Sequence, residues 1–208
     1  MLINHKKKWI TGFAIVLGLF AAYYFFIFNS YKSGIVDVDS TYISYDNADS
    51  LVSSAELVVI ASPVADFDDR EHDVTTYLTG AVQDFSTKTE LRVENILKGD
   101  WNEEFLTVIE PVSYVQSLDG KQKITRDGYV EMQKGHTYII ALKKNTFGDY
   151  SIINRENGVF DLNDKISTPN SFSAEQNNTS DIISVEGKNE ELFEHERIKN
   201  EILDMFNM

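Results

Sequence analysis

Hydrophobic and polar positions divide this chain into one long apolar run followed by many short alternating segments. The run extends from Trp9 to Phe28 and contains no charged residue. A helix of this length, with a rise of about 1.5 Å per residue, spans roughly 30 Å, which is the hydrocarbon thickness of a bilayer. Aromatic side chains at both ends suit the membrane interfaces. We therefore expect residues 9–28 to form a transmembrane helix that anchors the chain in a lipid bilayer.

The charges around this run predict its orientation. Lys6, Lys7 and Lys8 precede it, and residues 1–28 contain no carboxylate. Because basic residues stay on the cytoplasmic side, residues 1–8 should be a cytoplasmic stub and the remaining chain should be extracytoplasmic, as in a single-pass protein of the cell membrane. A cleaved signal peptide is one alternative, but its apolar part is about 7–15 residues long and ends in small residues. A buried core helix, the other alternative, is rarely apolar on every face. We favour an uncleaved signal anchor.

Beyond the anchor, the pattern predicts a short helix and a series of strands. Residues 29–45 lack helical periodicity and should be a tether. Residues 46–55 should form a short helix with Asn47 or Asp49 as its N-cap. Strands are expected where β-branched residues form a run or where apolar and polar residues alternate. These segments are residues 57–61, 87–97, 105–110, 112–117, 121–125, 138–142, 150–153 and 159–162.

The spacing of these strands predicts the fold class. Residues 118–120 (Leu-Asp-Gly) and 156–158 (Glu-Asn-Gly) each lie between two strands and should form hairpin turns. Many short strands with such turns are typical of a closed barrel or a sandwich. We expect a mainly β fold in which residues 46–162 form one extracytoplasmic β-barrel domain. Residues 163–188 are rich in Ser, Asn and Thr and should be a flexible loop, and residues 189–208 should form an amphipathic C-terminal helix.

Composition then narrows the function classes. The chain has 33 acidic and 19 basic side chains, a net charge of -14, which excludes nucleic acid as a partner because phosphate binding needs clustered Lys and Arg. It has no cysteine, which excludes disulfides, thiolate zinc sites and cysteine nucleophiles. No H-E-x-x-H, G-x-S-x-G or phosphate-binding glycine motif occurs. We therefore expect neither an enzyme nor a resident cofactor.

The densest polar cluster follows the first expected barrel strand. Asp66, Asp68, Asp69 and Asp73 could supply oxygen ligands to a hard cation, and Ca²⁺ is the metal that such a loop would suit. The segment lacks the spacing and the glycine of an EF-hand. A solvated acidic loop without metal is therefore the simpler interpretation of the same residues.

Histidines and aromatic residues give weaker candidates. The three histidines after the anchor have no zinc-binding spacing: His72, His136 and His195. Five aromatic residues could form a stacking surface for a ligand on a barrel face: Tyr77, Phe85, Tyr114, Tyr129 and Tyr138. Large rings on strands more often belong to the core, and we expect that role for most of them.

Three segments together resemble a known barrel family. They are AELVVIASPV at 55–64, TELRVENILKGD at 89–100 and GYVEMQKGHTYIIALKKN at 128–145. Their order is similar to that in the OB-fold barrel of netrin-like domains, such as tissue inhibitors of metalloproteinases, and in membrane-anchored proteins of Gram-positive bacteria. The resemblance implies a fold only. The inhibitors bind their target's zinc through an N-terminal cysteine, which this chain lacks, so their mechanism is not implied.

The anchor, the barrel pattern and the missing catalytic motifs together predict a class of function. We expect a non-catalytic binding or interaction domain at the bacterial cell surface, with an envelope protein or a glycan as its ligand. Two alternatives stay open at this point. One is a cation-dependent hydrolase that uses the loop between Asp66 and Asp73, and the other is an inhibitor of an envelope protease that acts without cysteine.

Overall fold

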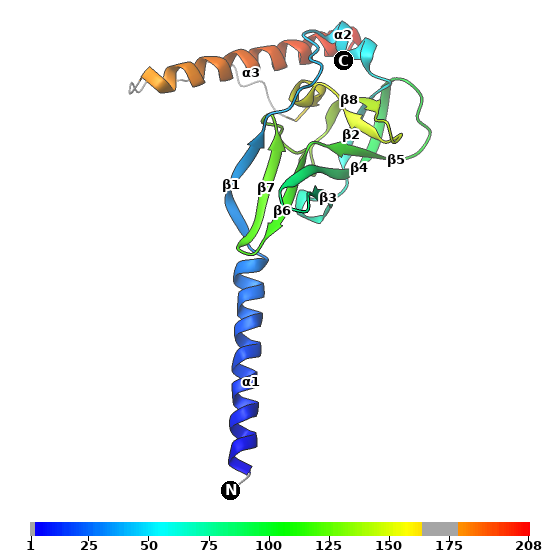
Figure 1. The fold of residues 1–208 in the computed structure, drawn as a ribbon. Coiled ribbons are helices and arrows are strands. Elements are labelled where there is room, and N and C mark those ends of the chain that lie inside the picture. Colours follow the sequence, from blue (N-terminus) through cyan, green and yellow to red (C-terminus); the bar gives the residue numbers. More distant parts are fainter. Residues whose placement is uncertain (1–2, 164–178) are drawn as a thin grey trace.

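The N-terminal helix stands apart from a β-rich domain. A computed structural model describes residues 3–163 and 179–208. Helix α1 (Ile3–Tyr23) continues into a π-helical turn, η1 (Tyr24–Phe28), and both project away from the domain (Figure 1). Its apolar part, Trp9–Phe28, is long enough to cross a membrane, and none of it is buried against the protein. This excludes a core helix and leaves a membrane anchor or a signal sequence.

A three-stranded sheet joins α1 to the rest of the domain. Its order is β1 (Tyr31–Val38), β7 (Gly120–Arg126) and β6 (Val112–Ser117), with β1 parallel to β7 and β7 antiparallel to β6. In Figure 1, β1 leaves the end of α1 and runs beside β7 toward the barrel. The segment 29–45, predicted as a tether, thus contains a strand. Most side chains of β1 are exposed, so it has no buried face that an apolar alternation would reveal.

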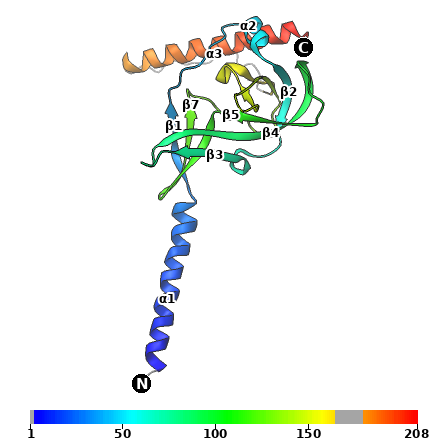
Figure 2. The same ribbon diagram turned by 45° about the vertical axis from the view of Figure 1, so that its right-hand side comes forward.

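Five strands close into a barrel, which confirms the predicted mainly β fold class. The circle runs through strands β8, β2, β4, β5 and β9, and the antiparallel pairing of β9 with β8 closes it. Their bounds are β2 (Leu57–Pro63), β4 (Val82–Lys98), β5 (Phe105–Glu110), β8 (Tyr138–Lys144) and β9 (Tyr150–Ile152). Two further strands extend it: β3 (Glu71–Thr76) pairs with β4, and β10 (Val159–Asp161) pairs with β8. Figure 2 shows β4 crossing the width of the domain.

Strand β2 separates two layers of core, which explains its uninterrupted apolar sequence. Leu57, Val59 and Ala61 point into the barrel. Val58 and Ile60 point to the opposite side, where helices α2 and α3 cover the barrel. Because successive side chains of a strand face opposite sides, a strand buried on both faces has no polar alternation.

Both predicted helices of the domain are present. Asn47 caps α2 (Ala48–Ser54) by accepting a hydrogen bond from the Ser50 N–H, as predicted. Helix α3 (Thr179–Met205) begins before the predicted position 189, and it packs Ile198 and Ile202 into the layer that contains α2. Residues 164–178 of the predicted flexible loop lie outside the described residues.

One of the two predicted hairpin turns is correct. Residues 118–120 connect β6 to β7 as expected. Residues 156–158 do not connect paired strands, because β9 and β10 lie one after the other along the same edge of β8. The turn η3 (Arg155–Gly158) spans the step between them, and Asn154 and Arg155 have positive φ angles of 63° and 52°. The Glu-Asn-Gly sequence does form a turn, but β9 and β10 both pair with β8 and not with each other.

Candidate functional site

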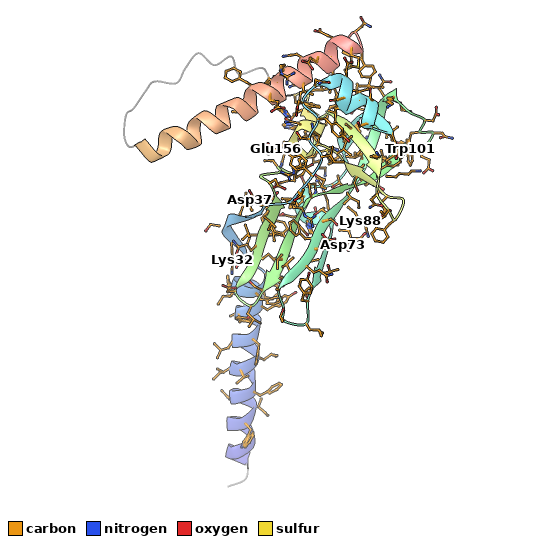
Figure 3. All side chains as sticks on the ribbon, turned by 45° about the horizontal axis from the view of Figure 1, so that its top comes forward. Lys32, Asp37, Asp73, Lys88, Trp101 and Glu156 are labelled. Atoms are coloured by element: carbon orange, nitrogen blue, oxygen red, sulfur yellow. The ribbon has the colours of Figure 1, made fainter. Side chains whose placement is uncertain are left out.

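A groove lies between one side of the barrel and helix α3. Its volume is about 430 Å³, a size that suits a small ligand. Its walls combine polar groups with a larger share of apolar surface, and they come from the loop between β7 and β8, from β8, β10 and η3, and from α3. The residues that line it are Tyr129, Val130, Glu131, Gln133, His136, Tyr138, Glu156, Val159, Asp161, Leu192, His195, Glu196 and Lys199. Figure 3 shows Glu156 beside α3.

A histidine–carboxylate pair forms the barrel side of the groove. Strand pairing places Asp161 of β10 opposite Tyr138 of β8. His136 precedes β8 by two residues, and its Nδ1 lies 2.5 Å from Oδ2 of Asp161. The rings of His136 and Tyr138 are nearly parallel, with centroids 6.2 Å apart. The carboxylate of Asp161 therefore orients the imidazole ring of His136, which lies beside the Tyr138 ring at the groove wall.

Helix α3 supplies the opposite wall through one of its faces. Leu192, His195, Glu196 and Lys199 have the spacing i, i+3, i+4 and i+7, which places them on one side of a helix. Nδ1 of His195 lies 3.1 Å from Oδ1 of Asn157, and this contact ties the helix to η3. The spacing of these four residues is visible in the sequence, but the histidines taken one by one do not reveal that His195 shares a helix face with Glu196 and Lys199.

The polar groups of this helix face are only partly satisfied. Lys199 is 5% exposed, and within the described part of the chain its ion-pair partner is Glu196, with the Lys199 Nζ and the Glu196 Oε1 separated by 4.0 Å. The other carboxylate oxygen of Glu196 is buried and has no hydrogen-bond partner among the described residues. A buried polar atom without a partner costs free energy, so this wall has unused capacity for hydrogen bonds to a ligand.

Acidic groups outnumber cations around the groove. Four carboxylates line it, against the single ammonium of Lys199. Three of the four have a basic partner: Glu131 pairs with Lys123, Asp161 pairs with His136, and Glu196 lies 4.0 Å from Lys199. This charge balance disfavours an anionic ligand and favours hydroxyl, amide or cationic groups.

A buried ion pair beneath the groove holds its floor in place. Arg70 Nη1 lies 2.7 Å from Glu110 Oε1, and both side chains are inaccessible to solvent. Glu110 Oε2 accepts hydrogen bonds from the Tyr129 hydroxyl and from the Met132 N–H, each at 2.9 Å. Arg70 also donates to the Met132 carbonyl at 2.6 Å. Burial raises the pKa of the Glu110 carboxyl, and the donors around it act in the opposite direction. The pair thereby anchors the loop that carries Tyr129 into the groove.

The four predicted metal ligands have different surroundings. Three of the carboxylates face separate partners, and Asp69 lies exposed in the turn η2 (Phe67–Asp69). The partners are Lys134 at 3.5 Å for Asp66, the Tyr114 hydroxyl at 2.9 Å for Asp68, and Lys88 at 3.1 Å for Asp73. Figure 3 shows Asp73 and Lys88 side by side. Within residues 9–163 and 192–208, no three His, Asp or Glu side chains converge to hold a metal ion.

His72 occupies a structural position on β3. The Thr87 hydroxyl donates to the Val112 carbonyl at 2.6 Å, so it accepts from Nδ1 of His72 at 2.8 Å. Nε2 of His72 is then unprotonated, and it is buried without a hydrogen-bond partner among the described residues. The ring packs edge-on against Phe67 and Tyr114. Burial lowers the pKa of His72, with the Phe67 carbonyl acting in the opposite direction.

The aromatic residues proposed as a stacking surface mostly belong to the core. Phe85, Tyr129 and Tyr138 are buried, whereas Tyr77 is exposed and Tyr114 is half-buried. Only Tyr129 and Tyr138 also reach the groove.

No protein-family model matches this chain, and no curated protein sequence matches it.

Proposed function

We propose that this protein is a membrane-anchored, non-catalytic binding protein of the bacterial cell surface. Its extracytoplasmic domain binds a hydroxyl-rich ligand, of the chemical kind of a glycan, in the groove between the barrel and α3. The observation that carries the proposal is the groove itself, in which partly satisfied polar groups of α3 face an aromatic and histidine-lined wall. Sugar hydroxyls pair with such carboxylate, imidazole and amide groups, and an aromatic ring supports the apolar face of a sugar.

The way α1 meets the domain supports an uncleaved anchor. The Tyr23 hydroxyl donates to the Leu118 carbonyl at 2.5 Å, and the Gln116 side chain donates to the Phe28 carbonyl at 2.8 Å. The Lys121 N–H donates to the Ser30 carbonyl at 2.8 Å. A segment removed by signal peptidase would take these contacts with it. The orientation proposed from the lysines of residues 6–8 puts the barrel outside the cell.

Binding without catalysis is favoured by the residues around the His136–Asp161 pair. Such a pair activates a nucleophile when a hydroxyl or thiol lies within hydrogen-bond reach. The described residues that line the groove include no Ser, Thr or Cys, and their two tyrosine hydroxyls have structural partners: Tyr129 donates to Glu110, and Tyr138 accepts from the Gln133 N–H. The cation-dependent hydrolase has less support, because Asp66, Asp68 and Asp73 face separate partners. The inhibitor hypothesis and the relationship to OB-fold, netrin-like proteins of Gram-positive bacteria rest on the sequence resemblance.

The test is a ligand panel on the full chain in lipid nanodiscs. The panel contains neutral oligosaccharides, anionic glycans and cationic peptides, and the readout is the melting temperature. A ligand at 100 times its Kd stabilises the folded state by about 2.7 kcal/mol, so neutral oligosaccharides should raise the melting temperature and anionic ones should not. If no member of the panel shifts it, the proposed ligand class is wrong.

A matched pair of variants assigns the shift to the groove. Glu196→Gln keeps the size of the side chain and removes its charge, and it should weaken binding about tenfold or more because a charged acceptor is lost. Glu103→Gln makes the same change on an exposed turn and should bind like the wild type. The bound ligand should be recovered intact by mass spectrometry. Recovery of a cleaved ligand would contradict the non-catalytic part of the proposal.

A further inference from the structure

The tip of the β6–β7 hairpin packs against the end of the apolar helix. Its hydrogen bonds reach back along α1 to Tyr23, whose hydroxyl meets the Leu118 carbonyl at 2.5 Å. Tyr23 precedes Phe28, the last residue of the apolar segment, by five positions. At about 1.5 Å per residue, the tip therefore reaches roughly 7 Å below the end of that segment. The views in Figures 1 and 2 both place this hairpin at the junction of α1 and the domain.

Polar groups at the tip are paired within the protein. The single hydroxyl hydrogen of Ser117 has two acceptors within reach, Asp119 Oδ1 at 2.7 Å and the Gly120 carbonyl at 2.8 Å. Lys32 Nζ lies 2.6 Å from Asp119 Oδ2, and Lys32 and Ser117 lower the pKa of Asp119 to about 2. Figure 3 shows Lys32 where β1 meets α1. The remaining side chain of the tip, Leu118, is apolar and 78% exposed.

The next residues outward have the chemistry of a headgroup layer. Tyr31 of β1 stands opposite Lys121 of β7, and the Lys121 ammonium lies 5.1 Å from the centre of the Tyr31 ring. The Tyr31 side chain is exposed. Amphipathic tyrosine rings prefer the membrane interface, and an ammonium beside them suits lipid phosphates. From the tip toward the barrel, the apolar Leu118 comes first, beside the ion pair of Asp119 and Lys32, and Tyr31 and Lys121 follow. An apolar side chain followed by an aromatic ring and an ammonium suits the step from lipid to water.

We propose that the β6–β7 hairpin is a second membrane contact, which inserts Leu118 into the outer interface of the bilayer beside α1. This inference rests on the anchor of the proposed function and goes beyond it. Tyr31 and Lys121 lie at the level of the lipid phosphates. With two contact points, the helix and the hairpin, the domain has a fixed orientation on the membrane and does not swing about residues 29–30.

Because the chain contains no cysteine, single cysteines can test this placement. Leu118→Cys is labelled with an environment-sensitive fluorophore in full-length protein in vesicles of phosphatidylcholine and phosphatidylglycerol. Lipids carrying a nitroxide at the headgroup or deep in the acyl chain then quench the probe by depth. The matched control is Phe147→Cys, because Phe147 is 89% exposed on the turn between β8 and β9. Figure 1 shows β8 in the part of the domain that lies away from α1. A second control, Leu19→Cys, lies near the middle of the apolar helix, about half-way between Trp9 and Phe28.

The proposal predicts that headgroup nitroxide quenches the Leu118 probe several-fold more than the Phe147 probe, while acyl-chain nitroxide quenches the Leu19 probe. If Leu118 behaves like Phe147 and Leu19 is quenched, the hairpin contact is wrong and the anchor stands. If Leu19 is also unquenched, the anchor itself is wrong, and the hairpin contact is wrong with it. Melting temperatures of the three labelled chains, compared with the wild type, show that each remains folded.

Discussion

Two polar clusters of the domain contain the same kinds of side chain and differ in how well those side chains are satisfied. Inside the barrel, Arg70 and Glu110 are 2.7 Å apart, and both oxygens of Glu110 accept hydrogen bonds. In the groove, Lys199 is equally buried, but its acidic neighbour Glu196 lies 4.0 Å away. We call the inner cluster closed because both carboxylate oxygens of Glu110 have partners. We call the groove cluster open because Oε2 of Glu196 has no hydrogen-bond partner among the described residues.

The difference separates a structural role from a binding role. A buried carboxylate with several donors has no remaining capacity for a ligand, and removing one partner leaves a stranded charge. A carboxylate oxygen that is buried and lacks a partner, such as Oε2 of Glu196, gains most from a new donor. Variants of the inner cluster should therefore change stability, and variants of the groove should change binding.

The largest expected effect comes from Glu110→Ala. It leaves the Arg70 guanidinium buried without its counter-charge, which should lower the free energy of unfolding by about 3–5 kcal/mol. Urea unfolding of the full chain in detergent measures it. The double variant Arg70→Met with Glu110→Leu removes both charges and should regain part of that loss, while the Tyr129 hydroxyl and the Met132 N–H still lack their acceptor. A single variant that loses less than about 1 kcal/mol would show that the inner pair does not support the fold.

Lys199→Met should affect stability much less. The ion-pair partner of Lys199 among the described residues, Glu196, lies 4.0 Å away, so an apolar chain of similar length should leave the free energy of unfolding within about 1 kcal/mol of the wild type, or raise it. The same unfolding experiment measures it, and ligand affinity in nanodiscs is expected to change. A loss of several kcal/mol would place Lys199 with the closed cluster.

The pH dependence of stability should contain a contribution from His72. Burial lowers its folded-state pKa below 6.5, so the unfolded chain binds more protons than the folded chain as the pH falls. The contribution is complete above about pH 6.5 and is lost as the pH falls toward the folded-state pKa. His72→Gln should flatten this part of a melting-temperature profile, while Asn102→Gln on an exposed turn should leave it unchanged. An unchanged profile in His72→Gln would show that this ring does not titrate as inferred.

The smallest effect is expected from a surface pair on the barrel. Arg92 Nε and Glu104 Oε1 are 3.6 Å apart, and both side chains are mostly exposed. Arg92→Gln should therefore change the free energy of unfolding by no more than about 0.5 kcal/mol. A change as large as that of Glu110→Ala would mean that burial does not separate the roles of the charged clusters.

Much of the barrel could be predicted because its strands have local signals. The apolar run of β2, the alternation of β4 and the Asp-Gly turn at residues 118–120 all depend on neighbours in the sequence. Strand β1 could not be predicted, because its parallel partner β7 lies about 90 residues away and its side chains are exposed. The hairpin predicted at residues 156–158 is wrong for the same reason, a partner that is distant from the local sequence signal. Strands β9 and β10 pair with the same edge of β8, and that pairing depends on the whole sheet.

The groove was harder to predict than the fold. The helix face with His195, Glu196 and Lys199 follows from spacing alone. The opposite wall, with His136 and Asp161, requires the pairing of β8 with β10 and the packing of α3 on the barrel. The acidic loop was predicted as a metal site because its carboxylates are close in sequence. In the structure, three of these carboxylates face separate partners.

The most direct test measures stability and ligand affinity together for Glu110→Gln and Glu196→Gln in the full chain, with the oligosaccharide that shifts the wild type most. The same chemical change is made in the closed cluster and in the open one. Glu110→Gln should lose about 2 kcal/mol or more of stability and, at a temperature where it is folded, lose less affinity than Glu196→Gln, because Glu110 supports Tyr129 from below and does not line the groove. Glu196→Gln should keep its stability and lose about tenfold in affinity. If Glu196→Gln binds like the wild type, or if both variants lose stability without losing affinity, the groove is not the binding site.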